Sequence, residues 1–329
     1  MRGLRNLGNG KVELVDDLPT PKPGDGEVLV KIKASAVCGS ELGAINGDNE
    51  MDGNSGHECM GIVQDPNGST RVEKGQRVGV ATLQGCGTCM WCDQGKPDFC
   101  DNVGVVGNTH SEFVVSKERW LLPLPDDITD VEGVLLAGDG LGVPWGASVR
   151  GEVEEGNITC VLGCGAVGLG NLLVHRYLGA QVIAVDINPK RLDLAEQMGA
   201  WKTINARESD VGDAMMELTD GVGPDVCIEA CGQQATLDAA IKGTKPGGTI
   251  VQCGHGEQSI NPQNLICRRN LRLVGNWVCH FCEVDDMMTA IRRGLRIRDL
   301  VTGIYPLEEA QTGYDRFIAG EEAKIVFTQ

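Results

Sequence analysis

Residues 158–186 read ITCVLGCGAVGLGNLLVHRYLGAQVIAVD, and this stretch decides the fold of the chain. A short apolar run at 158–162 leads without a linker into the glycine-rich segment 163–168. Apolar residues then recur at helical spacing, and a second apolar run follows at 182–185. The pattern predicts a strand, a tight turn, a helix and a second strand that ends at Asp186.

The glycines of this stretch have the order G-x-G-x-x-G, and each has a physical role in binding a dinucleotide. Gly163 permits the tight turn, Gly165 lets a pyrophosphate approach the backbone, and Gly168 lets the helix pack closely on its strand. Ala166 and Val167 start the helix, whose unpaired N–H groups and positive dipole end attract phosphate. We therefore predict that this loop holds the phosphates of a dinucleotide cofactor.

The residues at the end of the second strand bear on the choice between NAD and NADP. Asp186 supplies a carboxylate that can accept hydrogen bonds from both ribose hydroxyls and would repel a 2′-phosphate, which favours NAD. Ile187 and Arg191 complete the predicted cofactor contacts. Arg191 and Lys190 also supply positive charge for a 2′-phosphate, so NADP stays open. A glycine turn without a ligand is disfavoured by the strand, helix and aspartate around it.

Composition and charge limit the class of protein. The 329 residues give room for two domains of ordinary size. The net charge of −17 and the lack of a basic block argue against a nucleic-acid ligand. The opening MRGLRNLGNGKVELVDD does not resemble a secretion signal, and no apolar run is long enough to span a bilayer. We therefore expect a cytoplasmic protein without a membrane partner, whose 14 cysteines are free thiols or metal ligands.

Four cysteines lie close together in residues 86–100, CGTCMWCDQGKPDFC. Four thiolates can close a tetrahedron around Zn²⁺ without an open position, so such a site stabilises a loop and takes no part in the reaction. Disulfides are disfavoured by a reducing compartment. A ferredoxin-like iron–sulfur cluster is the closer rival, but its spacing continues C-x3-C-Pro, whereas seven residues precede the last cysteine here. We predict a structural zinc site with the ligands Cys86, Cys89, Cys92 and Cys100.

A second set of potential zinc ligands is spread over the first half of the chain. Cys38 in CGSE and His57 in GHE supply a thiolate and an imidazole, and Glu58 supplies an acid next to the imidazole. Asp139 lies in a glycine-rich apolar segment, where burial costs free energy unless the carboxylate is paired or bound to a metal. From these residues alone, Cys38 could equally be a buried thiol, His57 an ordinary histidine and Asp139 a helix-capping residue.

Strands and helices alternate after Asp186, which predicts a parallel, doubly wound sheet of the α/β class. The expected helices cover residues 189–198, 210–219, 235–242 and 284–293. The expected strands cover residues 202–205, 225–229, 249–253 and 271–278. Strand character also marks residues 1–37 and 103–125, and a helix from residue 304 is expected before a closing strand at 324–327.

The order of these motifs resembles the zinc-containing medium-chain dehydrogenase/reductase superfamily, to which alcohol dehydrogenases belong, and in particular its polyol and threonine dehydrogenase branch. The resemblance extends over nearly the whole chain, from CGSE to the C-terminal PLEEAQ and AKIVF. It implies a GroES-like β-rich catalytic domain at residues 1–139, a Rossmann domain at 140–276, and a segment at 277–329 that completes the catalytic domain. It also implies an active site between the domains and a homodimer or homotetramer.

By this resemblance, Cys38, His57 and Asp139 hold a catalytic zinc ion. Glu58 matches an acid beside the zinc that can exchange onto it. Glu41 matches a carboxylate that bonds the second nitrogen of the imidazole, although relatives usually carry the shorter Asp there.

The resemblance also assigns roles outside the metal ligands. Ser40 matches the hydroxyl that bonds the substrate oxygen and takes its proton, and Lys324 lies where a basic residue reaches the cofactor phosphates. Gly43 stands where many relatives have a histidine that helps the proton leave. His110 stands in place of an aromatic wall of the substrate pocket. We hypothesise that His110 bonds a second hydroxyl or a carboxylate of the substrate, or supplies the missing relay; a surface histidine is the alternative.

The implied reaction is hydride transfer between a small-molecule secondary alcohol and NAD, with one catalytic and one structural Zn²⁺ per chain. An acidic third ligand such as Asp139 is commoner in dehydrogenases of polyols, sugars and amino alcohols, which makes these the preferred substrates. Simple alcohols and aldehydes are the alternative. A zinc-ribbon binding module would account only for the cysteine lobe, and a zinc-free quinone reductase would lack Cys38, His57 and that lobe.

Overall fold

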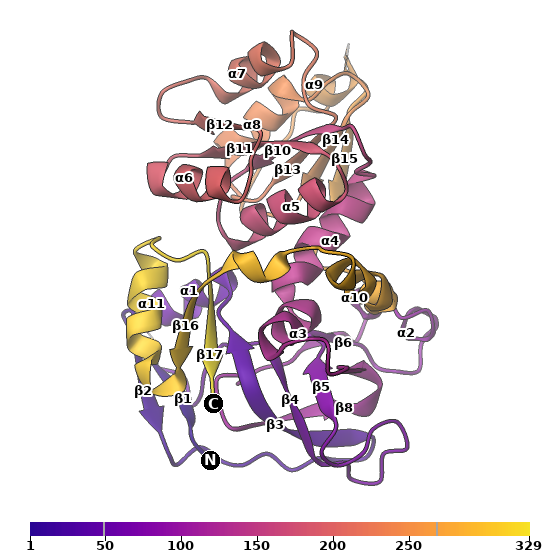
Figure 1. Ribbon diagram of the computed structural model, residues 1–329, viewed down its shortest axis with the longest axis vertical. Coiled ribbons are helices and arrows are strands. Elements are labelled where there is room, and N and C mark those ends of the chain that lie inside the picture. Colours follow the sequence, from indigo (N-terminus) through magenta and orange to yellow (C-terminus); the bar gives the residue numbers. More distant parts are fainter. Residues whose placement is uncertain (49, 268) are drawn as a thin grey trace. The chain divides into compact units, whose positions relative to one another are not determined.

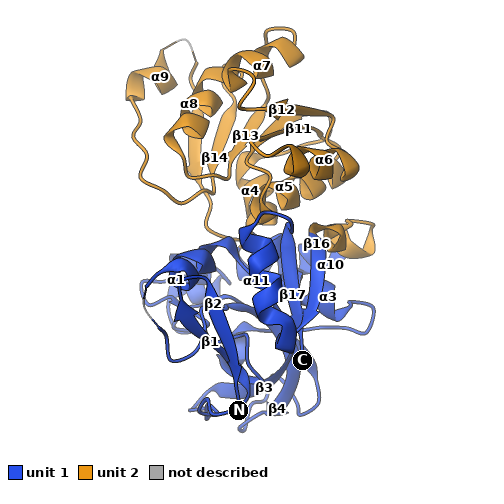
Figure 2. Ribbon diagram, turned by 90° about the vertical axis from the view of Figure 1, so that its left-hand side faces the viewer, with its two compact units in different colours: residues 1–142, 280–289, 301–329 blue, residues 143–279, 290–300 orange. Residues whose placement is uncertain are grey.

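The computed structural model describes residues 1–48, 50–267 and 269–329, which form two compact units. Unit 1 contains residues 1–142, 280–289 and 301–329, and unit 2 contains residues 143–279 and 290–300 (Figure 2). Each unit has its own sheet and its own apolar core.

Unit 2 is built on a six-stranded parallel sheet (Figure 1). Its strands are β10 (Ile158–Leu162), β11 (Gln181–Asp186), β12 (Lys202–Asn205), β13 (Val226–Glu229), β14 (Thr249–Gln252) and β15 (Arg272–Gly275). They lie in the order β12-β11-β10-β13-β14-β15, so the chain starts in the middle, moves to one edge and returns to build the other half. This is the strand order of a Rossmann sheet, with the reversal between β10 and β13. The predicted α/β class and doubly wound parallel sheet are confirmed.

Helices connect these strands, because parallel neighbours need a crossover connection. They are α5 (Ala166–Tyr177), α6 (Pro189–Gln197), α7 (Val211–Leu218), α8 (Gln234–Gly243) and α9 (Pro262–Ile266). α5 packs on β10 and β11, and α8 packs on α7 and β13. The buried side chains of Leu162, Ile183 and Leu237 belong to the core of this unit. Burying a side chain of this size contributes roughly 1.5–3 kcal/mol to folding.

Unit 1 contains a seven-stranded, mainly antiparallel sheet. Its strands are β3 (Glu27–Ala36), β4 (Glu58–Asp65), β5 (Arg77–Val80), β8 (Phe113–Lys117), β9 (Leu121–Pro123), β16 (Val301–Pro306) and β17 (Lys324–Thr328). Two small two-stranded sheets join β1 (Gly3–Gly8) to β2 (Lys11–Val15) and β6 (Leu83–Gln84) to β7 (Gly104–Val105). In β3, Val28, Val30 and Ile32 alternate with more exposed residues, which is the period of a strand that faces a core on one side.

The C-terminal strand β17 lies inside the sheet of unit 1, between β16 and β3. Tyr314 and Phe327 from this end of the chain share a buried cluster with Leu4 and Val37 from its beginning. The helices that lie wholly or partly in this unit are α1 (Leu42–Asn46), α2 (Met90–Asp93), α3 (Asp130–Ala137), α4 (Asp139–Gly151), α10 (Val284–Arg292) and α11 (Ala310–Ile318). Of all the helices in the described part of the chain, none combines the length and apolar character needed to cross a membrane.

The predicted elements differ from the structure in a few places. The strand expected at 271–278 is limited to β15, and residue 304 lies in strand β16 instead of starting a helix. β16 is a strand because it pairs in parallel with β17, a partner that the local pattern does not reveal. α3 and α4 were not predicted, because the glycines and Pro144 of this stretch weaken its helical pattern.

The unit boundaries also differ from the predicted domain boundaries. They lie at 142/143 and 279/280 instead of 139/140 and 276/277. Residues 290–300 belong to unit 2 and not to the segment that completes unit 1. The physical reason is that Ile297 and Leu300 are fully buried and their helical turn packs against α5.

His175 is a fully buried histidine on α5. Its Nδ1 lies 3.0 Å from Thr159 Oγ1, and its Nε2 has no partner among the described residues. Burial lowers the pKa of His175 to about 3, so the folded protein keeps the ring neutral. The unfolded chain binds a proton near the ordinary pKa of 6.5, so this ring opposes folding as the pH falls from 6.5 towards 3 and has no such effect above 6.5.

Replacing His175 with leucine is therefore expected to make unfolding less dependent on pH. Between pH 7 and pH 5 this one ring should remove about 2 kcal/mol from the unfolding free energy of the wild type, because each unit below the unfolded pKa costs about 1.4 kcal/mol. Chemical denaturation at both pH values measures the difference. His255→Leu, at an exposed position of the same unit, is the matched control. Equal pH dependence in the wild type and His175→Leu would contradict the burial penalty.

Candidate active site

The glycine-rich loop between β10 and α5 has the conformation of a phosphate-binding turn. Gly163 has a φ of 101°, which L side chains rarely adopt. A Cβ atom at Gly168 would overlap the carbonyl oxygen of Gly163, so only glycine lets α5 start this close to β10. A Cβ atom at Gly165 would meet nothing within 4 Å, so the space there is open to a ligand. Ala166 and Val167 form the half-buried start of α5.

Asp186 is held at the carboxyl end of β11, beside this loop. Its Oδ2 accepts a hydrogen bond from the N–H of Cys164 at 2.8 Å, and its Oδ1 accepts one from the N–H of Asn188 at 2.8 Å. The guanidinium of Arg191 lies 3.9 Å from Oδ2. The carboxylate is therefore fixed in position, and a cation lies at its edge.

One cavity of unit 2 brings the predicted cofactor contacts together. It has a volume of about 780 Å³, the size of an ordinary cofactor site. Its lining includes Gly163, Gly165, Asp186, Ile187 and Arg191.

The same cavity is lined by residues that were not predicted. Cys231, Gln233 and Thr236 follow β13 and face the cavity from its other side. A signal for them was present in the sequence, because ligands of parallel sheets bind at the carboxyl ends of the strands on both sides of the reversal point.

Four cysteine thiols meet in residues 86–100 of unit 1. The Sγ atoms of Cys86, Cys89, Cys92 and Cys100 all lie within 4.8 Å of one another, and all four are free thiols. α2 carries Cys92, and the N–H of Cys86 donates to the Sγ of Cys100 at 3.3 Å. Trp120 packs against this lobe from outside the loop. The structure thus brings together all four predicted ligands.

The donor set of this lobe fits a structural zinc ion. Four sulfur donors suit zinc and leave no open position for a substrate. Hydrogen bonds from Thr88 lower the pKa of Cys86 to about 6, whereas burial raises the pKa of Cys92 to about 12. A divalent cation would stabilise the thiolate form of every one of them.

A second cluster in unit 1 joins Cys38, His57, Glu58 and Asp139, whose donor atoms also lie within 4.8 Å of one another. Cys38 follows β3, His57 directly precedes β4, Glu58 is the first residue of β4, and Asp139 is the first residue of α4. The Oδ2 of Asp139 lies 3.5 Å from the Sγ of Cys38 and 3.2 Å from the Nε2 of His57. Residues that are distant in the sequence therefore converge on one point.

The acidic side chains of this cluster favour a positive charge at the point where they meet. Burial lowers the pKa of His57, but its hydrogen bonds to Asp139 and Cys38 outweigh burial and raise that pKa to about 12. Burial also raises the pKa of the Cys38 thiol. The acidic side chains thus attract positive charge to the point where they meet. Thiolate, imidazole and carboxylate are the donors that zinc prefers, so the cluster fits a catalytic zinc ion.

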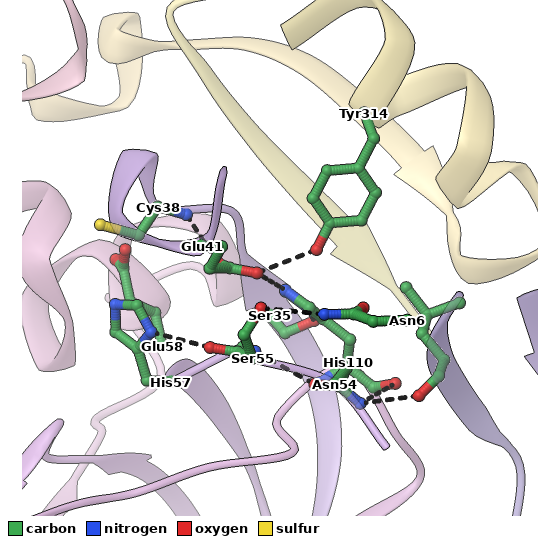
Figure 3. Close-up of polar contacts among 12 residues, drawn as sticks. Asn6, Ser35, Cys38, Glu41, Asn54, Ser55, His57, Glu58, His110 and Tyr314 are labelled. Carbon is green, nitrogen blue, oxygen red and sulfur yellow. Dashed lines mark hydrogen bonds and ion pairs between the residues drawn. The ribbon is translucent and has the colours of Figure 1, made fainter. Parts of the chain in front are cut away.

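Glu41 does not have the predicted partner. The Nδ1 of His57 lies 3.1 Å from the carbonyl oxygen of Ser55, and the carboxylate of Glu41 points away from that ring, toward Tyr314 and His110 (Figure 3). Burial raises the pKa of Glu41, but the neighbouring His110 outweighs this and holds the pKa below its ordinary value. The prediction for Glu41 is wrong because its two carboxylate oxygens are taken by the N–H of Cys38, the ring of His110 and the hydroxyl of Tyr314.

Lys324 also differs from its prediction. It is 1% exposed, and its Nζ donates to the Oε1 of Glu58. The Oε2 of Glu58 accepts a hydrogen bond from the N–H of Gly140 at 3.2 Å. The ammonium group is therefore paired with Glu58 of the candidate metal cluster. The buried side chain presents no surface to a cofactor phosphate.

His110 lies in the interior of unit 1. The side chain is fully buried, its Nδ1 lies 2.8 Å from Ser35 Oγ and its Nε2 lies 3.0 Å from Glu41 Oε2. Its ring keeps the packing of an aromatic residue, edge-on to Phe327 with a centroid separation of 5.2 Å. His110 is thus neither a surface histidine nor a wall of an open pocket.

Ser40 lies in the short helical turn after Cys38, and its side chain is exposed. Gly43 is exposed in the first turn of α1, and as a glycine it offers no side chain for a proton relay. The position of Ser40, two residues after a candidate ligand, suits a group that exchanges a proton with water.

Two models of protein families match different parts of the chain. The models described as "Alcohol dehydrogenase GroES-like domain" and "Zinc-binding dehydrogenase" match residues 24–126 and 166–293. L-threonine 3-dehydrogenase of Shewanella sp. (strain MR-7) is 29% identical over 346 residues, which cover 100% of this chain and 99% of the relative.

Solved structures agree with these matches. Alcohol dehydrogenase TADH from Thermus sp. ATN1 has a TM-score of 0.89 and 25% identity, with 100% of this chain and 99% of that chain covered. Zinc dependent alcohol dehydrogenase 2 from Streptococcus pneumonia, in its apo form, has a TM-score of 0.87 and 28% identity, with 100% and 98% covered.

Proposed function

Because the chain belongs to the zinc-containing, alcohol dehydrogenase-like superfamily of medium-chain dehydrogenases/reductases, we propose that it oxidises secondary alcohols with NAD. The observation that carries this proposal is the convergence of Cys38, His57, Glu58 and Asp139 on one point in unit 1. A dinucleotide loop in unit 2 provides the second requirement, a place for the hydride acceptor.

Cys38, His57 and Asp139 would hold the catalytic zinc ion, with Glu58 in reach of the same point. When bound, zinc supplies a Lewis acid that lowers the pKa of an alcohol hydroxyl. The exposed hydroxyl of Ser40 then takes the proton of the alcohol and passes it to water. With Gly43 in place of a histidine, this relay is short.

Unit 2 holds the oxidant. The open space at Gly165 admits the pyrophosphate, and the fixed carboxylate of Asp186 accepts hydrogen bonds from the ribose hydroxyls. When bound, NAD⁺ would supply the acceptor for a hydride from the carbinol carbon, so that an alcohol that also loses its hydroxyl proton would become a carbonyl. Asp186 favours NAD, and Arg191 at 3.9 Å supports NADP as the alternative.

The substrate class is narrowed by the third ligand and by the relatives. Asp139 provides an acidic third ligand, as in dehydrogenases of polyols, sugars and amino alcohols, and an L-threonine 3-dehydrogenase is among the similar proteins. We therefore infer a secondary alcohol with a hydroxyl or amino group on the neighbouring carbon. Simple alcohols and aldehydes are the second candidate class, favoured by the similarity to alcohol dehydrogenases.

A substrate panel read by NADH absorbance tests the proposal. Vicinal diols, polyols and 2-amino-3-hydroxy acids are expected to give kcat/KM values at least about tenfold above those of simple alcohols, because a second polar group adds about 1.4 kcal/mol or more of transition-state binding. NADP is run in parallel, and Asp186→Ala is expected to shift the cofactor preference toward NADP. Equal rates with simple alcohols would support the second class, and no turnover of any alcohol or carbonyl would contradict the proposal.

A further inference from the structure

Glu41 and His110 form a buried pair of ionisable groups beside the candidate metal cluster. Both side chains are 0% exposed, and Oε2 of Glu41 lies 3.0 Å from Nε2 of His110. Burying two ionisable groups costs folding free energy unless both groups have good partners. The contacts of the two side chains indicate what the pair does.

Glu41 is tied to the turn that carries Cys38. The N–H of Cys38 donates to Oε1 of Glu41 at 2.7 Å. The hydroxyl of Tyr314 donates to Oε2 at 2.9 Å, so the carboxylate is held from α11 as well. The carboxylate therefore fixes the main chain of the candidate ligand Cys38.

His110 is fixed by its own main chain and by Ser35. Its N–H donates to Oδ1 of Asn54 at 3.1 Å, and its carbonyl oxygen accepts from Nδ2 of Asn54 at 3.2 Å. Its Nδ1 pairs with the hydroxyl of Ser35 on β3 at 2.8 Å. The ring thus has one orientation, with Nε2 directed at Glu41 (Figure 3).

The same histidine also bears on the turn that carries His57. Oδ1 of Asn54 accepts a second hydrogen bond, from the N–H of Gly56 at 3.2 Å. The ring of His110 occupies the space beside Gly56, where a Cβ atom would lie 2.5 Å from Cδ2. Among the described residues, the partner of His57 Nδ1 is the main-chain oxygen of Ser55, so the direction of that ring depends on where residues 54–56 lie.

We propose that Glu41 and His110 are a positioning pair that joins the Cys38 turn to the His57 turn and keeps the four donor atoms of the metal cluster together. In most metal sites the outer partner bonds the ligand imidazole directly, and its loss weakens metal binding by about 10- to 100-fold. Here the support reaches both ligands through the main chain. The inference rests on the proposed function in one respect, because it takes the four-donor cluster to be a metal site.

The experiment measures metal affinity in the full-length protein without substrate. Competition with a chelator gives the dissociation constant of the more weakly held zinc ion, and the zinc ion of the four-cysteine lobe is the internal reference. Glu41→Gln and His110→Leu are each expected to raise that dissociation constant by about 10- to 100-fold and to leave the reference unchanged. The double variant should lose no more than the worse single variant, since the two side chains act as one unit.

A spectrum gives a second readout. With Co²⁺ in the weaker site, its visible bands report the arrangement of Cys38 and His57, and both variants are expected to shift them. Tyr305→Phe is the matched control, because it also removes a tyrosine–glutamate hydrogen bond from unit 1, but that bond joins Tyr305 to Glu322 at 3.0 Å and not to Glu41 or His110. It should lower thermal stability and keep the dissociation constant within about threefold of the wild type.

Three outcomes decide the matter. Unchanged zinc affinity and an unchanged cobalt spectrum in Glu41→Gln and His110→Leu would overturn the proposal while leaving the proposed function intact. A wild-type protein that binds no metal outside the cysteine lobe would instead overturn the proposed function. If His110→Leu does not fold, Ser35→Ala takes its place, because it removes only the hydroxyl that orients the ring of His110. A zinc dissociation constant of Ser35→Ala equal to that of the wild type would then reject the proposal.

Discussion

Replacing Asp139 with alanine is expected to lower kcat/KM by about a thousandfold or more, which corresponds to about 4 kcal/mol of lost transition-state stabilisation. The Oδ2 atom of Asp139 is the point where Cys38 at 3.5 Å and the ring of His57 at 3.2 Å meet. Without this carboxylate the cluster loses one negative donor and the anchor of the imidazole. Steady-state kinetics with the best substrate of the panel measures the loss.

Zinc content separates this effect from unfolding. Asp139→Ala should contain one zinc ion per chain in place of two, and the remaining ion should resist chelators because the four-cysteine lobe is closed. Asp285→Ala is the control, since it removes an exposed acid from the first turn of another helix, α10, and should leave activity and zinc content unchanged. Full activity of Asp139→Ala with two bound zinc ions would contradict the metal cluster.

Gly168→Ala is expected to destabilise unit 2 by about 3 kcal/mol or more, because the added methyl group would overlap the carbonyl oxygen of Gly163. No flexible side chain can move out of the way, since the obstacle is main chain. The expected drop in Tm is roughly 6–12 °C. Thermal unfolding followed by circular dichroism measures it.

Gly165→Ala is the matched control from the same loop and tests binding in place of folding. A Cβ atom there meets nothing within 4 Å, so Tm should change little. The methyl group would stand where the pyrophosphate approaches, and the affinity for NADH should fall by about tenfold or more. NADH fluorescence titration measures this. Equal behaviour of the two variants would contradict the separate roles of these glycines.

The sequence was most informative where local pattern alone determines structure. β12 was expected at 202–205 and occurs as Lys202–Asn205, because this short segment lies between clear helix signals, Gly199 after α6 and the N-cap Asp210 of α7. The four-cysteine lobe was equally easy to predict from the sequence, since its donors lie within one short loop. α4 was not, because Pro144 and several glycines conceal a helix that tertiary packing stabilises.

The candidate site was predicted in its members but not in all of its contacts. The resemblance identified Cys38, His57 and Asp139 as partners, and the structure brings them together. The partners of Glu41 and Lys324 were assigned incorrectly, because the direction of a buried side chain depends on neighbours that only the fold supplies. For Glu41 that neighbour is Tyr314, which is contributed by the far end of the chain.

The arrangement of unit 1 has a consequence for synthesis on the ribosome. Unit 2 uses residues 143–279 and 290–300, so its sheet can form while the last segment is still being translated. Unit 1 has to wait, because β17 fills the gap between β16 and β3 and Lys324 pairs with Glu58. We therefore expect the nascent chain to form the candidate nucleotide site first, and unit 1 with its candidate metal cluster to mature only after Lys324–Thr328 has emerged from the exit tunnel.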